Sequence, residues 1–140
     1  MRVVLDSNVL LSALISPHAS PHRIYIAWRK GLFELVTCRH QIEEVRRASK
    51  YPKLQRILQG HRVGALINNL QRAIMINTPA EHSIDVRDPH DAFLLALAQA
   101  GNADALVTGD RSAGLLELGS YHRARIVTPA QFCAELLGLS

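Results

Sequence analysis

The stretch Arg2-Val3-Val4-Leu5-Asp6 near the N-terminus is a short β-branched run that ends in an acid. The apolar run that follows, at residues 9–15, is too long for a second strand, so we expect a strand and then a helix. Ala105-Leu106-Val107 gives another buried-strand signal, which ends at Thr108-Gly109-Asp110. Short apolar strands that alternate with helices favour an α/β fold, in which helices cover both faces of a parallel sheet.

The rest of the chain keeps this alternation. Further strands are expected at residues 32–36, 74–76 and 125–127. Ser20-Pro21 resembles an N-cap followed by the first helical residue, and Asp88-Pro89-His90-Asp91 is a strong helix start that Gly101 ends. Other helices are expected at residues 20–30, 39–49, 63–73, 92–100 and from Thr128-Pro129 onward.

Composition places this chain among globular domains. Its 140 residues are 48% hydrophobic and 20% charged, with 8 Gly and 6 Pro, which excludes disorder and predicts a single domain over residues 1–140. No apolar stretch of about eighteen residues or more predicts a membrane span, and no signal-peptide pattern follows the N-terminus. Cys38 and Cys133 lie far apart in no metal or redox spacing, so we expect both in the core of a cytoplasmic protein.

Three aspartates are expected to meet at one edge of the sheet. Asp6 and Asp110 directly follow predicted parallel strands, whose carboxyl ends border the ligand crevice of open α/β sheets. Asp91, in the first turn of a helix, reaches the same rim if the crossover is right-handed. Crowded carboxylates raise one another's pKa unless a cation joins them. No His or Cys stands at ligand spacing, and an all-oxygen set predicts Mg²⁺ or Mn²⁺.

Each acid also has a simpler interpretation. Asp6 or Asp110 alone could begin a turn or cap the next helix. Asp88 before Pro89 is more typical of an N-cap than of a ligand, and Asp91 in the first turn favours the helix dipole. Asp104 is most simply a turn residue. The joint placement of the acids, and no single one, favours the functional interpretation.

Two glutamates on the helix at residues 39–49 compete for a fourth position in this cluster. With Ile42, Val45 and Ala48 as the buried stripe, Glu44 lies nearer the edge of the stripe and Glu43 points to solvent. With a different buried stripe, Glu43 and Glu44 would lie equally close to it, so spacing alone leaves the choice open.

The sequence resembles the PIN-domain nucleases, and within them the toxin components of toxin–antitoxin systems. The resemblance covers nearly the whole chain. Its motifs are short, and their order and spacing make them specific. They are Val3-Val4-Leu5-Asp6-Ser7-Asn8-Val9-Leu10, Ile42-Glu43-Glu44-Val45, Tyr51-Pro52-Lys53-Leu54, Arg87-Asp88-Pro89-His90-Asp91, Leu106-Val107-Thr108-Gly109-Asp110 and Ile126-Val127-Thr128-Pro129.

The resemblance implies a Rossmann-like, three-layer α/β/α sandwich with about five parallel strands. Matched position by position, the family's catalytic, metal-holding acids fall on Asp6, Glu44, Asp91 and Asp110, so the resemblance selects Glu44 over Glu43. Supporting positions fall on Asn8 and Thr108, and Asp88 matches a frequent acid that could be a cap, a support or both. Ser7 stands where the family often has Thr, which keeps the hydroxyl.

The implied activity is hydrolysis of RNA phosphodiester bonds by metal-activated water, which leaves a 5′ phosphate. The resemblance implies a cognate antitoxin as a partner and assembly into a homodimer. The alternative is a catalytically silent PIN-like module that binds RNA or protein. An aspartyl-phosphate phosphatase is a poor alternative because Asn8 stands where that class needs a second Asp.

Positive charge is concentrated beside Glu44. The chain has 16 Lys and Arg against 12 Asp and Glu, a net charge of +4. Arg46, Arg47, Lys50 and Lys53 are the RNA-binding candidates, together with Arg111 next to Asp110. A solvated helical face is the alternative, since Tyr51 is the only aromatic residue among them. Surface roles are expected for the seven histidines, and a core position for Trp28.

Overall fold

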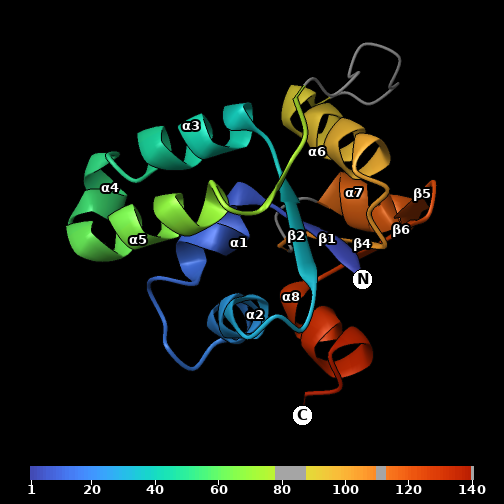
Figure 1. The fold of residues 1–140 in the computed structure, drawn as a ribbon, viewed down its shortest axis with the longest axis horizontal. Helices are drawn as coiled ribbons and strands as arrows, with labels where there is room; N and C mark the ends of the chain where they lie inside the picture. The colour runs from blue at the N-terminus through green and yellow to red at the C-terminus, as the bar shows by residue number, and fades with distance from the viewer. Residues whose placement is uncertain (78–87, 110–112, 140) are drawn as a thin grey trace.

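A computed structural model of the chain describes residues 1–77, 88–109 and 113–139. Six strands form one sheet in the order β3-β2-β1-β4-β6-β5 (Figure 1). Five of them run parallel, as expected. The strands are β1 (Arg2–Leu5), β2 (Glu34–Thr37), β3 (Ile74–Met75), β4 (Ala105–Val107), β5 (Ser120–Tyr121) and β6 (Ala124–Val127).

The strand order has a topological switch point between β1 and β4, where the chain changes from one side of the sheet to the other. From β1 the chain continues to β2 and β3 on one side, and β4 joins the other side of β1 with Val3 opposite Ala105 and Leu5 opposite Val107. Ligands of open α/β sheets bind outside the carboxyl ends of the strands at such a point. Asp6 and Thr108 directly follow these two strands and therefore flank the switch point.

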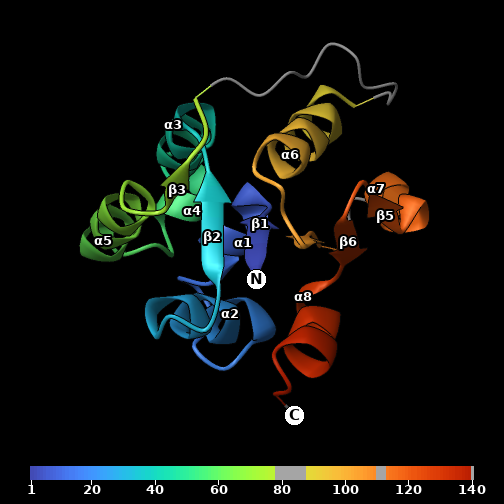
Figure 2. The ribbon, with the colours of Figure 1, turned by 45° about the vertical axis from the view of Figure 1, so that its right-hand side comes forward.

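Helices cover both faces of the sheet, which gives the expected three layers. Successive strand residues point to opposite faces. Val3 and Leu5 join a core with α1, α2, α3 and α5, whereas Val4 joins a second core under α6 and α7. Figure 2 shows α3 and α6 on opposite sides of β1 and β2. These helices are α1 (Ser7–Ser12), α2 (Ser20–Arg29), α3 (Arg39–Ala48), α5 (Gly60–Leu70), α6 (Pro89–Ala100) and α7 (Ala113–Leu118).

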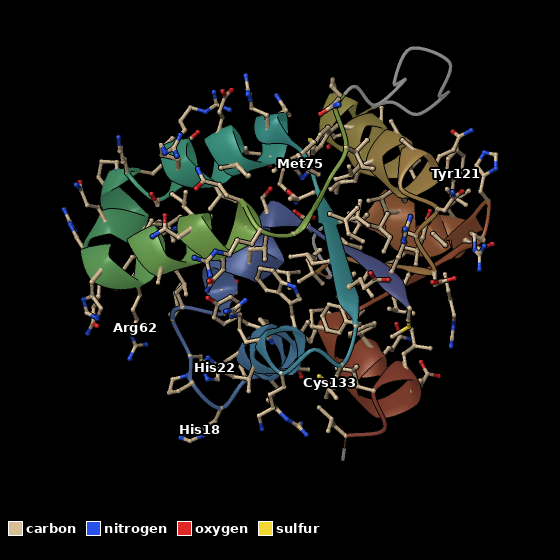
Figure 3. The ribbon with its side chains drawn as sticks, in the orientation of Figure 1. His18, His22, Arg62, Met75, Tyr121 and Cys133 are labelled. Atoms are coloured by element: carbon tan, nitrogen blue, oxygen red, sulfur yellow. The ribbon has the colours of Figure 1, made fainter. Side chains whose placement is uncertain are left out.

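Two short elements complete the described helices. They are α4 (Pro52–Gln55), after α3, and α8 (Pro129–Gln131), which continues into a π-helical turn, η1 (Phe132–Leu136). Thr128 caps α8 in a capping box with Gln131. Trp28, Cys38 and Cys133 are buried, as expected, and Figure 3 shows Cys133 between α2 and the C-terminal turns. Within the described residues, no helix is long and apolar enough to cross a membrane.

Several boundaries differ from the expected ones. Asp88 caps α6 and Gly101 ends it as expected, but the N-cap of α2 is Ala19, and Ser20 is already helical. The second strand is Glu34–Thr37 instead of 32–36, because Leu32 belongs to the turn after α2. The antiparallel edge strand β5 and the helix α7 were not predicted. Both are short, and β5 has only two residues with little apolar character.

Asp104 is more than a turn residue, because it joins three strands. Its Oδ2 accepts the Arg2 backbone N–H at 2.8 Å, and its Oδ1 lies 2.9 Å from Nη2 of Arg123. Its backbone carbonyl accepts the N–H of Arg125 in β6. The Arg2 N–H, with Arg123 next, holds the pKa of the Asp104 carboxyl below its usual value.

Replacing Asp104 is expected to make stability less dependent on acid pH. A lowered carboxyl pKa adds stability above the unfolded value of 3.8 and loses it as pH falls through the folded value. We expect Asp104→Asn to cost about 0.5–1 kcal/mol at pH 7, because the ion pair is partly exposed. Urea unfolding at pH 7 and pH 3 measures this cost, which should shrink at pH 3. An equal cost at both pH values would contradict the assignment.

Candidate active site

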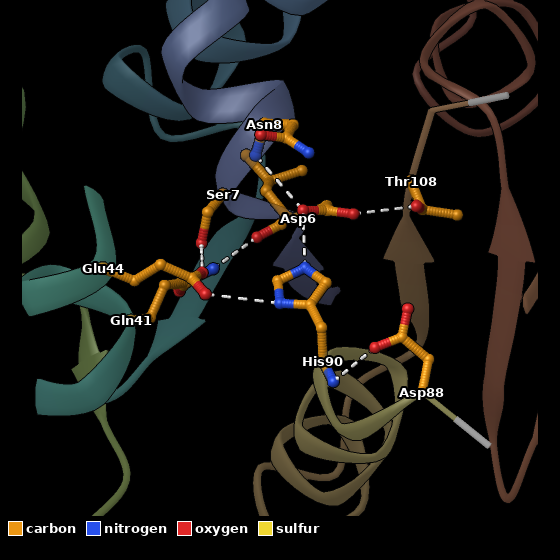
Figure 4. A network of polar contacts seen from close by, with 9 residues as sticks. Asp6, Ser7, Asn8, Gln41, Glu44, Asp88, His90 and Thr108 are labelled. Carbon is orange, nitrogen blue, oxygen red and sulfur yellow. Dashed lines mark hydrogen bonds and ion pairs between the residues drawn. The ribbon is translucent and has the colours of Figure 1, made fainter. Parts of the chain in front are cut away.

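Asp6 lies at the centre of a polar cluster at the switch point (Figure 4). It is 1% exposed, and its backbone N–H bonds the Val107 carbonyl at the end of β4. Its Oδ2 accepts the Thr108 hydroxyl at 2.9 Å, and its Oδ1 accepts the Asn8 backbone N–H at 3.1 Å. Asp6 is therefore also the N-cap of α1, as the simpler interpretation predicts, and it lies directly after β1, where the functional interpretation requires it.

A buried glutamine fixes α3 against the end of β1. Gln41 is fully buried; its Nε2 donates to the Leu5 carbonyl at 2.6 Å, and its Oε1 accepts the Thr37 hydroxyl at 2.5 Å. These bonds tie the first turn of α3 to the residue before Asp6. Gln41 was not predicted from the sequence, because glutamine is usually a surface residue of helices and its burial depends on partners from two strands.

Of the two glutamates on α3, Glu44 faces the cluster and Glu43 is exposed. Glu44 is half-buried, and its Oε1 accepts the Ser7 hydroxyl from the first turn of α1. The hydrogen bond from His90 is the main cause that lowers the pKa of the Glu44 carboxyl, with Ser7 adding to it against the effect of burial. The stripe that sequence analysis assigned to α3 thus agrees with the position of Glu44.

His90 lies between the two acids, which sequence analysis did not foresee. Its Nε2 is 3.2 Å from Asp6 Oδ1 and its Nδ1 is 3.3 Å from Glu44 Oε2. The hydrogen bonds to Asp6 and then to Glu44 raise the pKa of the imidazole to about 10, so the ring carries a positive charge at neutral pH. The expected surface role is wrong for His90. The sequence signal for a role of His90 in the site was its position next to Asp91, in the first turn of α6.

Asp91 lies in the same turn of α6 and faces the start of α7. A methyl group on Gly114 would lie 3.8 Å from its Oδ2. Burial is the main cause that raises the pKa of Asp91, and the negative charges of Asp88 and Asp6 add to it. Asp91 is therefore close enough to Asp6 for the two charges to interact. Asp88 is exposed and accepts the His90 backbone N–H at 2.9 Å, which makes it a helix cap.

The remaining predicted residues divide into three groups. Asp110 and Arg111 lie outside the described residues. Asn8 contributes its backbone N–H to Asp6, while its exposed side chain makes no hydrogen bond within the described part of the chain. Thr108 is buried and its hydroxyl holds Asp6 directly. The basic candidates are all exposed and lie on α3, the turn after it, and α4: Arg46, Arg47, Lys50 and Lys53.

The donor chemistry of this cluster fits a hard divalent cation. Asp6, Glu44 and Asp91 offer carboxylate oxygens from the end of β1, α3 and α6, and a positive charge already lies between Asp6 and Glu44. Among the residues of known placement, no three acids or histidines are grouped closely enough to coordinate one ion. Binding would therefore require the three carboxylates to draw together and the His90 ring to release its two contacts.

The fold and this cluster define an α/β protein with an acidic site at the carboxyl edge of a parallel sheet. Comparison with protein families matches residues 2–112 to the PIN domain, so the chain belongs to the PIN domain family. Among solved structures, it is similar to a chain in the crystal structure of VapBC2 from Rickettsia felis bound to a DNA fragment from their promoter. The identity is 14% and the TM-score 0.57, over 91% of this chain and 98% of that one. No curated protein matches the chain.

Proposed function

We propose that this protein is a divalent-metal-dependent ribonuclease that forms one nuclease domain over residues 1–140. The observation that supports the proposal is the placement of Asp6 and Glu44 on either side of the His90 ring at the switch point of a PIN-domain sheet, with Asp91 next to His90 in the first turn of α6. Together with Asp110, these three acids would hold Mg²⁺ or Mn²⁺, which lowers the pKa of a water molecule and stabilises charge on the scissile phosphate. In this reaction the water oxygen would bond to phosphorus as the P–O3′ bond breaks, so the products would carry a 5′ phosphate and a 3′ hydroxyl, and no covalent enzyme intermediate would form.

The chain's own residues keep the acids in place. Thr108 and the Asn8 backbone fix both oxygens of Asp6, so this carboxylate has little freedom to rotate. Ser7 fixes one oxygen of Glu44, and Gln41 anchors the helix that carries it. Such support fixes Asp6 and the helix that carries Glu44 before substrate binds, which lowers the cost of ordering them.

The basic residues near the site would bind the RNA backbone. Arg46, Arg47 and Lys50 extend from the helix that carries Glu44, and Lys53 follows on α4; Arg111 is proposed from sequence alone. Arginine and lysine neutralise phosphates and thereby give affinity that does not depend on sequence. We further propose that the protein is the toxin component of a toxin–antitoxin system, acts in the cytoplasm as a homodimer and has a cognate antitoxin, in line with its similarity to a VapBC2 chain.

The test is cleavage of a panel of single-stranded and structured RNAs with Mn²⁺, Mg²⁺ or EDTA. We expect cleavage by the wild type with either metal, no cleavage in EDTA, and a loss of about a hundredfold or more in the Asp6→Asn/Asp91→Asn double variant. Equal inactivity and equal RNA binding of both proteins, with no stabilisation by metal, would replace the proposal with a silent binding module.

A further inference from the structure

Charge is distributed unevenly along the chain. Residues 39–77 contain eight Lys and Arg and only two Glu, a net charge of +6, whereas the whole chain has +4. Seven of these eight cations lie between the start of α3 and the first turn of α5, and all eight are exposed. None of them forms an ion pair with any residue that the structure describes. A surface with this much uncompensated positive charge favours a polyanionic partner.

One aromatic side chain lies within this surface. Tyr51 is 53% exposed and stands at the corner between α3 and α4, with Lys50 before it and Lys53 two residues after it. Within the described residues its side chain makes no hydrogen bond and no ring contact. The other two tyrosines differ: the hydroxyl of Tyr25 accepts a hydrogen bond from Asn69, and the ring of Tyr121 packs against His122.

The backbone holds Tyr51 in place although its ring is free. Its N–H bonds the Ala48 carbonyl at 3.1 Å, and its own carbonyl accepts the N–H groups of Leu54 and Gln55 at 2.9 and 2.8 Å. Pro52 follows and favours the extended conformation that Tyr51 adopts, with φ −61° and ψ 136°. An exposed ring on a fixed backbone loses little conformational freedom when it binds a flat partner.

The helix connects Tyr51 with the acidic site. Glu44, Arg47 and Tyr51 are spaced by three and four residues, which places them along one face of α3 and the turn that continues it. Seven residues of helix correspond to about 10 Å. A strand that lies along this face therefore passes a carboxylate of the site, an arginine and an exposed aromatic ring in succession.

We propose that Tyr51 is a base-stacking subsite for single-stranded RNA, and that Arg47, Lys50 and Lys53 hold the phosphates on either side of the stacked base. The proposal rests on the proposed ribonuclease function and adds to it a residue that binds the bases of the substrate. Aromatic rings bind single strands by stacking on exposed bases, whereas the bases of a duplex are stacked on one another and present no free face. RNA at this surface is thus bound as a single strand.

The test measures binding in EDTA, so that it is independent of cleavage. Fluorescence anisotropy with a labelled RNA of eight nucleotides compares the wild type with Tyr51→Ala, Tyr51→Phe and the matched control Tyr121→Ala. Tyr121 lies at the end of the molecule opposite α4 (Figure 3). We expect Tyr51→Ala to weaken binding about tenfold and the other two variants to bind within about twofold of the wild type. A duplex of the same composition should bind all four proteins alike.

Three results would overturn the subsite. They are wild-type affinity of Tyr51→Ala for the single strand, an equal loss in Tyr51→Phe, and an equal loss of duplex binding. A fourth is binding of polyglutamate that is as strong as the binding of RNA and depends on Tyr51. It would indicate an acidic protein as the partner of this surface. Failure of the proposed function would give a different result. If the proteins show the expected binding pattern but the wild type cuts no RNA with Mn²⁺, the base-stacking subsite is supported and the ribonuclease activity is contradicted.

Discussion

Asp6→Asn is expected to abolish the stabilisation of this protein by Mn²⁺. A ligand that binds only the folded state adds about 2.7 kcal/mol at a hundred times its Kd. For a chain of this size, that corresponds to a rise in Tm of roughly 5–10 °C. Asparagine keeps the size of the side chain: its Oδ1 can still accept the Asn8 backbone N–H, and its Nδ2 can donate to the Thr108 hydroxyl, so the variant should fold. It lacks the charge that draws the cation to the end of β1.

The matched control for this experiment is Glu43→Gln, which removes one carboxylate from the exposed side of α3. We expect it to keep the full rise in Tm, whereas Asp6→Asn shows none. Differential scanning calorimetry with Mn²⁺ and with EDTA measures both. A rise of equal size in Asp6→Asn and in the wild type would show that any metal binds elsewhere, and would remove the basis for metal-dependent hydrolysis at this cluster.

The alternation of strands and helices could be predicted from the sequence because it depends on local patterns. The run from Val3 to Leu5 and the run from Ala105 to Val107 are apolar throughout, as buried parallel strands are. Asp88-Pro89 and Thr128-Pro129 mark their helix starts through local capping bonds. The strand Ser120–Tyr121 lacks such a pattern, because its pairing depends on the neighbouring strand and not on its own residues.

The candidate site was predictable only where a strand end or a family motif fixed a residue. Asp6 follows β1, and the position of Glu44 agrees with the predicted stripe of α3. Gln41 and His90 were missed for a common reason. Each is polar, and its importance comes from partners 36 and 84 residues away in the chain, Leu5 and Asp6. Only the packing of α3 and α6 around β1 brings these partners together.

His90→Ala is expected to have opposite effects on the metal-free protein and on metal affinity. The folded pKa of about 10 lies above the usual imidazole value of 6.5, so the charged ring stabilises the fold fully below about pH 6.5. That contribution is lost as pH rises through about 10. In EDTA we expect the variant to be roughly 3 kcal/mol less stable than the wild type at pH 6, with the difference shrinking toward pH 10. Urea unfolding at pH 6, 8 and 10 measures it.

With Mn²⁺ the same variant should bind more tightly, by about tenfold at pH 7. The ring's two nitrogens lie 3.2 and 3.3 Å from oxygens of Asp6 and Glu44, and a cation that uses those oxygens must displace the ring. Titration calorimetry measures the affinity, and His61→Ala, an exposed histidine at the start of α5, is the control expected to change neither property. Weaker Mn²⁺ binding by His90→Ala would mean that the ring supports the cation instead of competing with it. In that case, the help that the imidazole gives in positioning Asp6 and Glu44 would outweigh the repulsion between its positive charge and the cation.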